Sequence, residues 1–212
     1  SGHKVKMVCL NDARSDSGIN KPFVNGKRIG FVDDIEVLEL NIKYANKRKF
    51  YERVFIFFIY CWKSINLALE EDVDLIVATS TPLTIGIPGI IAYFFKKTPL
   101  VFEVRDLWPE LPKEMGIIKN PLILFLAEQL ERFTYRTAKA CIGLAPGICE
   151  GIKKGGAKES KVYLIPNFCD NKLFYPLSTG NKKKKPIKEI FSNIVIPKDS
   201  LIAAYTGAHG LC

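Results

Sequence analysis

The segment of residues 101–110, VFEVRDLWPE, gathers side chains that can do chemistry. A short apolar run leads into carboxylates, a guanidinium and an indole, contributed by Glu103, Arg105, Asp106, Trp108 and Glu110. Buried parallel strands read as apolar runs, and ligands of open α/β sheets bind outside the carboxyl ends of such strands. We therefore expect these side chains at or just beyond the end of a central strand, in a site that handles hydroxyls and phosphates. The alternative is a salt-bridged loop with Trp108 as a lid on the core.

Alternating strands and helices predict a Rossmann-like α/β fold, with a parallel sheet and helices on both faces. Apolar runs bounded by turn residues predict strands at residues 4–10, 35–40, 73–78, 99–103, 140–144 and 161–165. Periodicity predicts helices over residues 43–71 and 83–96, and two more that begin after Asn120 and at Pro146. No GxGxxG phosphate loop follows the first strand, which argues against simple dinucleotide binding.

Two polar segments border the predicted strands. Thr79 and Ser80 lie in a capping turn directly after the strand at 73–78, and we regard them as further substrate-binding candidates. Residues 11–30 are rich in Asn, Asp, Ser, Gly and Lys, which predicts a long polar loop. Loops longer than about 15 residues are uncommon in compact domains and often bind something. Plain disorder is the alternative, and the sequence leaves both open.

The helix predicted over residues 43–71 is both aromatic and basic. Its apolar stripe consists of Tyr51, Val54, Phe55, Phe58, Trp62, Ile65 and Leu69, and Ile56 and Ile59 widen it until the middle of the helix is apolar nearly all round. Cations cluster toward its start at Lys43, Lys47, Arg48, Lys49 and Arg53. Such a helix can lie in a membrane interface, or it can be buried between a sheet and a neighbouring helix. The helix after Asn120 carries a second stripe, formed by Leu122, Leu126, Leu130 and Phe133.

The composition is that of a globular protein with a surplus of positive charge. The 212 residues are 48% hydrophobic and 25% charged, with a formal net charge of +9. No apolar stretch approaches the roughly 20 residues of a membrane-spanning helix. The charge favours phosphorylated small molecules or anionic lipid as partners; nucleic acid is not expected, since aromatic residues are not interleaved with the basic ones. The six cysteines form no CxxC pairs or zinc-type spacing, so we expect no metal site and a reduced, cytosolic setting.

The composition changes near the carboxyl end of the chain. Residues 177–198 include the run Lys182 to Lys185 and predict a solvated linker after a first domain of residues 1–176. Residues 200–206 predict a strand, and Gly207, His209 and Gly210 follow it at once. Residues 199–212 are therefore expected to be the first element of a second Rossmann domain that is cut short.

Four segments in this order resemble a known family: residues 101–110, 146–156, 161–176 and 205–210. Together they are similar to the retaining glycosyltransferases of family 4, which have the GT-B fold, in the bacterial surface-polysaccharide branch that includes N-acetyl-fucosamine transferases. The resemblance covers nearly the whole chain. It implies an acceptor domain and a nucleotide-sugar domain that face each other across a cleft. It also implies that the chain is truncated at both ends, lacking the first strand and helix and most of the second domain.

The resemblance assigns roles to the candidate residues. Asp106 and Arg105 become catalytic candidates, and Glu103, Trp108, Glu110, Thr79 and Ser80 become substrate-binding candidates. Gly207, His209 and Gly210 would bind the donor diphosphate, with backbone N–H groups close to its oxygens. No metal or other cofactor is expected, because the nucleotide-sugar is a substrate. The sequence departs from the family pattern at Phe168 and Cys169, and at Arg105, where many relatives have histidine.

The expected function is transfer of a sugar, with retention, from a nucleotide-sugar to a lipid-linked glycan acceptor. The setting would be the cytoplasm or the inner face of the membrane, with an anionic membrane surface as a partner. The fragment alone is expected to be inactive. Two alternatives remain: a nucleotide-sugar epimerase of similar architecture, and a non-catalytic module that binds the acceptor.

Overall fold

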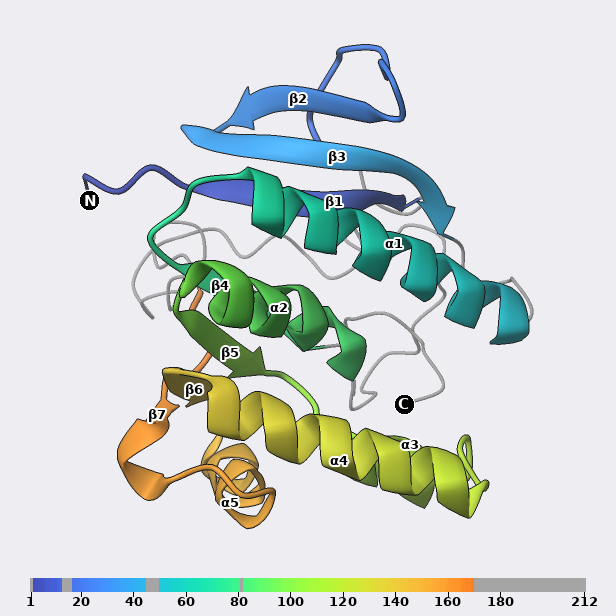
Figure 1. Ribbon diagram of the computed structural model, residues 1–212, viewed down its shortest axis with the longest axis vertical. Coiled ribbons are helices and arrows are strands. Elements are labelled where there is room, and N and C mark those ends of the chain that lie inside the picture. The colour runs from blue at the N-terminus through green and yellow to red at the C-terminus, as the bar shows by residue number, and fades with distance from the viewer. Residues whose placement is uncertain (1, 13–16, 45–49, 81, 170–212) are drawn as a thin grey trace, which may run out of the picture. The chain divides into compact units, whose positions relative to one another are not determined.

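The computed structural model describes residues 2–12, 17–44, 50–80 and 82–169 (Figure 1). The chain divides into two compact units, Ser1–Asn167 and Phe168–Cys212. All helices and strands given below belong to the first unit. The predicted linker at 177–198 and the predicted start of a second domain at 199–212 lie outside the described residues.

The first sheet has three strands in the order β1-β3-β2. Strand β1 (Lys6–Asp12) is parallel to β3 (Ile35–Tyr44), and β2 (Lys27–Val32) is antiparallel to β3. Asp33 and Asp34 join β2 to β3 and have φ angles of 47° and 66°. Two consecutive positive φ angles match the twist of a tight hairpin.

The prediction of one polar loop over residues 11–30 is therefore wrong for its second half, which includes part of β2. The alternation of KRIGFV is that of a half-buried strand, and Asn25 and Gly26 before it form another turn with positive φ angles. The polar composition of the segment is typical of a loop, so neither the strand alternation nor the turn was recognised from the sequence. At the start of the segment, residues 11 and 12 complete β1, and residues 17–23 form a loop.

The second sheet is parallel throughout, in the order β4-β5-β6-β7. Its strands are β4 (Ile76–Thr79), β5 (Leu100–Val104), β6 (Ala140–Gly143) and β7 (Val162–Leu164). The connecting helices are α1 (Phe50–Glu70), η1 (Leu83–Ile85), α2 (Gly86–Lys96), α3 (Glu110–Glu114), α4 (Pro121–Thr137), α5 (Pro146–Lys154) and η2 (Glu159–Lys161). Each of the six predicted strands corresponds to an observed one, and the predicted helix starts after Asn120 and at Pro146 are confirmed.

The core of the second sheet lies between its strands and helices α2, α4 and α5. Leu100, Phe102 and Val104 project from β5 and are at most 1% exposed. The ring of Phe102 lies 6.1 Å from that of Tyr135 on α4, and Gly89 of α2 approaches Leu100 so closely that a Cβ would collide with it. Gly143, in register with Val104, approaches Cys149 of α5 in the same way. The Rossmann-like α/β class, a parallel sheet flanked by helices, is confirmed, with these three helices packed on one face.

Helix α1 covers the first sheet through Ile56, which widens the predicted stripe, and Leu67, which the predicted stripe did not include. Its inward contacts with Leu38, Leu40 and Ile42 of β3 come from Ile56 and Leu67, which are 7% and 8% exposed. Phe55, Phe58 and Trp62, the aromatic members of the predicted stripe, are 66–67% exposed. The aromatic stripe therefore faces away from the core.

Candidate functional site

The carboxyl ends of β4 and β5 bring the first candidate residues together. Thr79 and Glu103 are register partners in this parallel pair, so their side chains emerge on the same face. The hydroxyl Oγ1 of Thr79 donates a hydrogen bond of 2.9 Å to Oε2 of Glu103. This hydrogen bond orients the carboxylate of Glu103, which is 20% exposed. The carboxylate lies at the carboxyl ends of the parallel strands, where α/β proteins bind ligands.

Ser80 fixes the path of the chain beyond β5. Its backbone N–H donates to the carbonyl oxygen of Glu103 at 2.7 Å, and its hydroxyl accepts from the backbone N–H of Arg105 at 3.0 Å. Ser80 is only 2% exposed, so this hydroxyl serves the backbone and is not available to a ligand. The structure therefore places Ser80 beneath the site, as a residue that positions Arg105 and Asp106.

Arg105 offers a cation at the same edge. Its Nε lies 3.4 Å from Oε1 of Glu103, which holds the guanidinium beside the carboxylate. The side chain is 56% exposed, so donors on its outer nitrogens can reach a bound anion. Asp106 follows directly and is partly buried. Two carboxylates and a guanidinium within four residues can together bind sugar hydroxyls and a phosphate.

Trp108 and Glu110 contact other parts of the protein. Trp108 packs against the core of the second sheet, in agreement with the alternative that its indole covers the core. Glu110 begins α3 and lines a cleft of about 290 Å³ between α3, α4 and α5, whose lining includes neither Glu103 nor Arg105. Substrate binding by Trp108 and Glu110 remains a prediction.

The same cleft contains Glu131, a residue that the sequence analysis did not identify. Burial raises the pKa of its carboxyl from 4.5 to about 7, helped by the negative charges of Glu110 and Glu128. A hydrogen bond from Tyr135 and the charge of Arg132 act in the opposite direction. The sequence did contain a signal, because Glu131 falls on the inward side of α4, one helical turn before the buried Tyr135.

Other expectations concern ligands and membranes. Within the described residues, no group of three or more His, Cys, Asp or Glu side chains could hold a metal ion. Gly207, His209 and Gly210 lie outside the described residues, so their diphosphate-binding role remains a prediction. None of the helices that the structure describes is both long and apolar enough to cross a membrane.

Solved structures to which the chain is similar include Anabaena Alr3699/HepE in complex with UDP-glucose. It is 18% identical over 62% of this chain and 31% of that one, with a TM-score of 0.40. Alr3699/HepE in complex with UDP and glucose is 16% identical over 75% of this chain and 36% of that one, with a TM-score of 0.43. A UDP-N-acetylglucosamine 2-epimerase is 13% identical over 76% of this chain and 48% of that one, with a TM-score of 0.41. The chain thus spans less than half the length of each of these proteins.

A search of curated proteins finds no match. The family model described as "Glycosyl transferase 4-like domain" matches residues 1–167, which include every described candidate residue at the ends of β4 and β5. The chain therefore belongs to the family of glycosyl transferase 4-like domains.

Proposed function

We propose that the protein is a retaining glycosyltransferase that moves a sugar from a nucleotide-sugar to a lipid-linked glycan acceptor. In this reaction the bond between the sugar's anomeric carbon and the diphosphate breaks, and a bond to an acceptor hydroxyl forms. The nucleoside diphosphate leaves, and its phosphate oxygen takes up the proton of the acceptor hydroxyl. The observation that carries the proposal is the family match over residues 1–167, which contains an oriented acidic and basic cluster at the carboxyl edge of a parallel sheet.

The cluster at the ends of β4 and β5 supplies the groups that this chemistry needs. Group transfer requires an acceptor hydroxyl held close to the anomeric carbon and a cation near the departing phosphate. Asp106 would accept a hydrogen bond from the acceptor hydroxyl and orient it. Arg105, more than half exposed, would attract the diphosphate, while Glu103 and Thr79 hold the guanidinium in place.

The finer features of the proposal are the biological setting and the donor. We infer a role in bacterial surface-polysaccharide synthesis, in the branch that includes N-acetyl-fucosamine transferases, at the cytoplasmic face of the membrane. The motif resemblance at residues 101–110 and 161–176 supports this branch. A second domain that follows the predicted linker would bind the nucleotide-sugar, through backbone N–H groups near Gly207, His209 and Gly210.

The test uses the protein expressed from its complete gene. It is incubated with a panel of UDP-, GDP- and dTDP-sugars and a lipid-diphosphate glycan acceptor, and release of the nucleotide is followed. We expect one donor to release nucleotide only when the acceptor is present, with a glycosylated lipid as product. Nuclear magnetic resonance of that product should show the anomeric configuration of the donor.

Two results would contradict the proposal. Epimerised nucleotide-sugar formed without acceptor would assign the protein to the epimerases instead. Acceptor binding without nucleotide release from any donor in the panel would favour a non-catalytic binding module.

A further inference from the structure

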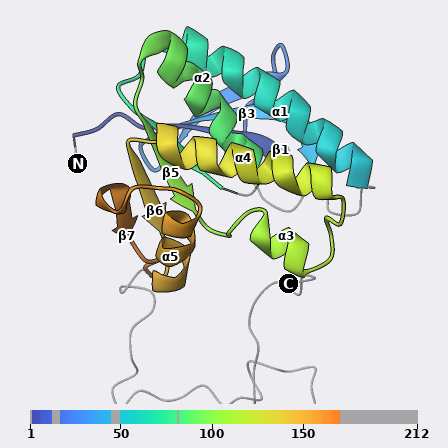
Figure 2. The same ribbon diagram turned by 60° about the horizontal axis from the view of Figure 1, so that its bottom comes forward.

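The cleft between α3, α4 and α5 lies apart from the residues at the carboxyl ends of β4 and β5. Helices α3 and α5 lie along the same side of α4 (Figure 2), and the cleft between the three has a volume of about 290 Å³. Its lining includes Leu107, the residue after Asp106, but none of Thr79, Glu103 and Arg105. Small-molecule sites have volumes of roughly 300–1,000 Å³, so this cleft has the size for a compact ligand.

Six charged side chains, three acidic and three basic, line the cleft. They are Glu110, Glu128, Glu131, Lys113, Arg132 and Lys154. Glu128 and Glu131 are partly buried, whereas the other four residues are exposed and form the rim. All six belong to the described part of the chain, and no ion pair joins any two of them. Their charges are therefore held around the cleft without neutralising one another by direct contact.

Glu131 has the least favourable surroundings of the three carboxylates. Burial raises its pKa to about 7, and the negative charges of Glu110 on α3 and Glu128 on α4 act in the same direction. A hydrogen bond from Tyr135 and the charge of Arg132 oppose this shift without cancelling it. A ligand group that donates a hydrogen bond to Glu131 would stabilise its ionised form further than the protein alone does.

The arrangement of the charges favours one class of ligand. A phosphate or carboxylate group would have to lie against Glu128 and Glu131 in the inner part of the cleft. An ammonium group would first have to pass Lys113 of α3, Arg132 of α4 and Lys154 of α5 at the rim. A neutral ligand with several hydroxyl groups meets neither repulsion, because a hydroxyl can both donate to a carboxylate and accept from a cation.

We propose that the cleft between α3, α4 and α5 binds one neutral sugar ring. Hydroxyls on the inner side of the ring donate hydrogen bonds to the carboxylates of Glu128 and Glu131, and hydroxyls on the outer side accept from the cations at the rim. The cleft begins next to Asp106, so a longer glycan bound there would extend toward the proposed transfer site. That the bound sugar belongs to the acceptor rests on the proposed function; the sugar site itself does not.

Sugar binding should be coupled to loss of a proton from Glu131. A hydroxyl that donates to this carboxyl favours the ionised form, so the ligand lowers the pKa that burial raises to about 7. By linkage, affinity then increases as pH rises through 7, and binding releases a proton. A lowering of the pKa by about one unit on binding corresponds to about fivefold tighter binding at pH 8 than at pH 6.

The test titrates the protein expressed from its complete gene with the methyl glycosides of glucose, galactose, mannose and N-acetylglucosamine, without nucleotide-sugar. Binding is followed through the backbone amide resonances of Gly151 and Gly155, which line the cleft. We expect at least one glycoside to shift both resonances and to bind about fivefold more tightly at pH 8 than at pH 6. Glu128→Ala should weaken this binding at least about tenfold, and Glu131→Gln should remove its pH dependence.

The matched control is Glu114→Gln, at an exposed carboxylate of α3 that does not line the cleft, and it should bind like the wild type. Inorganic phosphate and tetramethylammonium serve as charged probes and should not shift the two glycine resonances.

Three results would overturn the proposal. They are no shift with any of the four glycosides, a shift with a charged probe alone, and glycoside binding that neither pH nor Glu128→Ala changes. Glycoside binding in the cleft without nucleotide release from any donor would refute only the proposed transfer. Nucleotide release without glycoside binding in the cleft would refute only this sugar site.

Discussion

The hydroxyl of Ser80 and the backbone N–H of Arg105 form a hydrogen bond of 3.0 Å between the turn after β4 and the residue that follows β5. A second hydrogen bond, from the backbone N–H of Ser80 to the carbonyl oxygen of Glu103, links the same two segments. Through this pair, a serine that no ligand can reach sets the direction in which Arg105 and Asp106 leave the sheet.

Replacing Ser80 by alanine should therefore affect both stability and activity. The variant leaves the N–H of Arg105 without its partner, which should lower the free energy of unfolding by about 1 kcal/mol. Sugar transfer should fall by about tenfold, because Arg105 and Asp106 lose their fixed position. Denaturant unfolding and nucleotide release measure the two effects. Ser160→Ala, at an exposed serine of η2, is the matched control. Loss of stability with unchanged transfer would show that the site does not depend on this bond.

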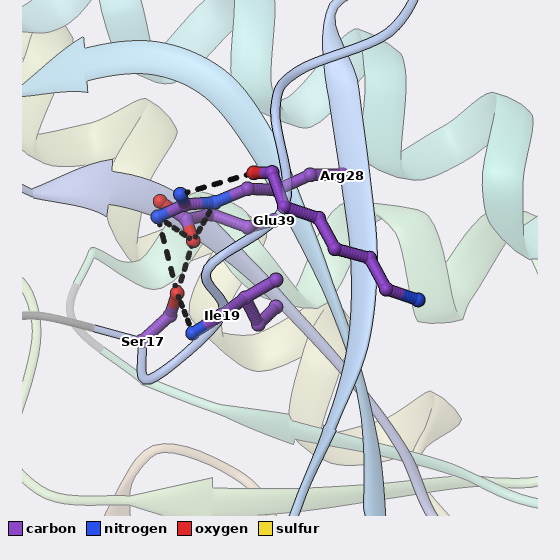
Figure 3. A network of polar contacts seen from close by, with 5 residues as sticks. Ser17, Ile19, Arg28 and Glu39 are labelled. Atoms are coloured by element: carbon purple, nitrogen blue, oxygen red, sulfur yellow. Dashed lines mark hydrogen bonds and ion pairs between the residues drawn. The ribbon is translucent and has the colours of Figure 1, made fainter.

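Arg28 and Glu39 form a buried ion pair under the loop of residues 17–21 (Figure 3). Glu39 is 2% exposed and accepts from Nε of Arg28 at 2.9 Å and from the hydroxyl of Ser17. Nη1 of Arg28 reaches the carbonyl of Lys21 at 3.5 Å. The pair therefore fastens the loop to β2 and β3.

Arg28→Met should lower the free energy of unfolding by about 3 kcal/mol, because it leaves a buried carboxylate without its cation. The double variant Arg28→Met/Glu39→Leu should recover most of that loss, since neither charge remains. Denaturant unfolding measures both, and Lys27→Met, at the exposed neighbouring position of β2, is the control. A double variant less stable than Arg28→Met would contradict this account of the pair.

Glu131 should make stability depend on pH. Its pKa is raised from 4.5 to about 7 on folding, so its contribution to stability is fully present below pH 4.5 and is lost as pH rises through about 7. Glu131→Gln removes this penalty and should stabilise the protein by about 1 kcal/mol at pH 8, a value reduced because the carboxyl is partly solvated. The gain should shrink toward pH 5. Thermal unfolding across this range tests it, with the exposed Glu70→Gln as control; a gain independent of pH would contradict the shift.

Asn120 caps the amino-terminal end of helix α4. Its Oδ1 accepts from the N–H groups of Leu122 and Ile123 at 2.9 and 3.3 Å. Asn120→Ala should lower the free energy of unfolding by about 1 kcal/mol, while Asn120→Asp should retain the wild-type value because aspartate caps equally well. Thermal unfolding compares the three proteins. Equal loss in both variants would mean that the loss does not come from the cap hydrogen bonds.

The helices and strands were predictable where short-range sequence signals determine them. The apolar runs of the second sheet and the Asn120-Pro121 helix start are short-range signals, and the structure confirms both. Strand β2 was missed because its cationic, glycine-containing sequence resembles a loop, and pairing with β3 determines its conformation. Periodicity identified an apolar stripe on α1, but it could not show which side of the helix packs on the sheet.

The candidate site was predictable only in part, because some of its features also depend on contacts distant in sequence. The segment at 101–110 revealed which residues follow β5, and the β4–β5 pairing joins Thr79 to Glu103. Sequence alone could not show that Ser80 is buried as a backbone support or that Glu110 lines a separate cleft. Both depend on how the chain turns after β5, which is set by contacts distant in sequence.

Acceptor-dependent nucleotide release by the wild-type protein, Asp106→Ala and Arg105→Met tests whether the carboxyl ends of β4 and β5 form the transfer site. Asp74→Ala, at an exposed aspartate before the amino end of β4, is the matched control. We expect both site variants to lose at least about a hundredfold in kcat/KM while the control retains wild-type activity. Unchanged release by Asp106→Ala and Arg105→Met would contradict a transfer site at the carboxyl ends of β4 and β5.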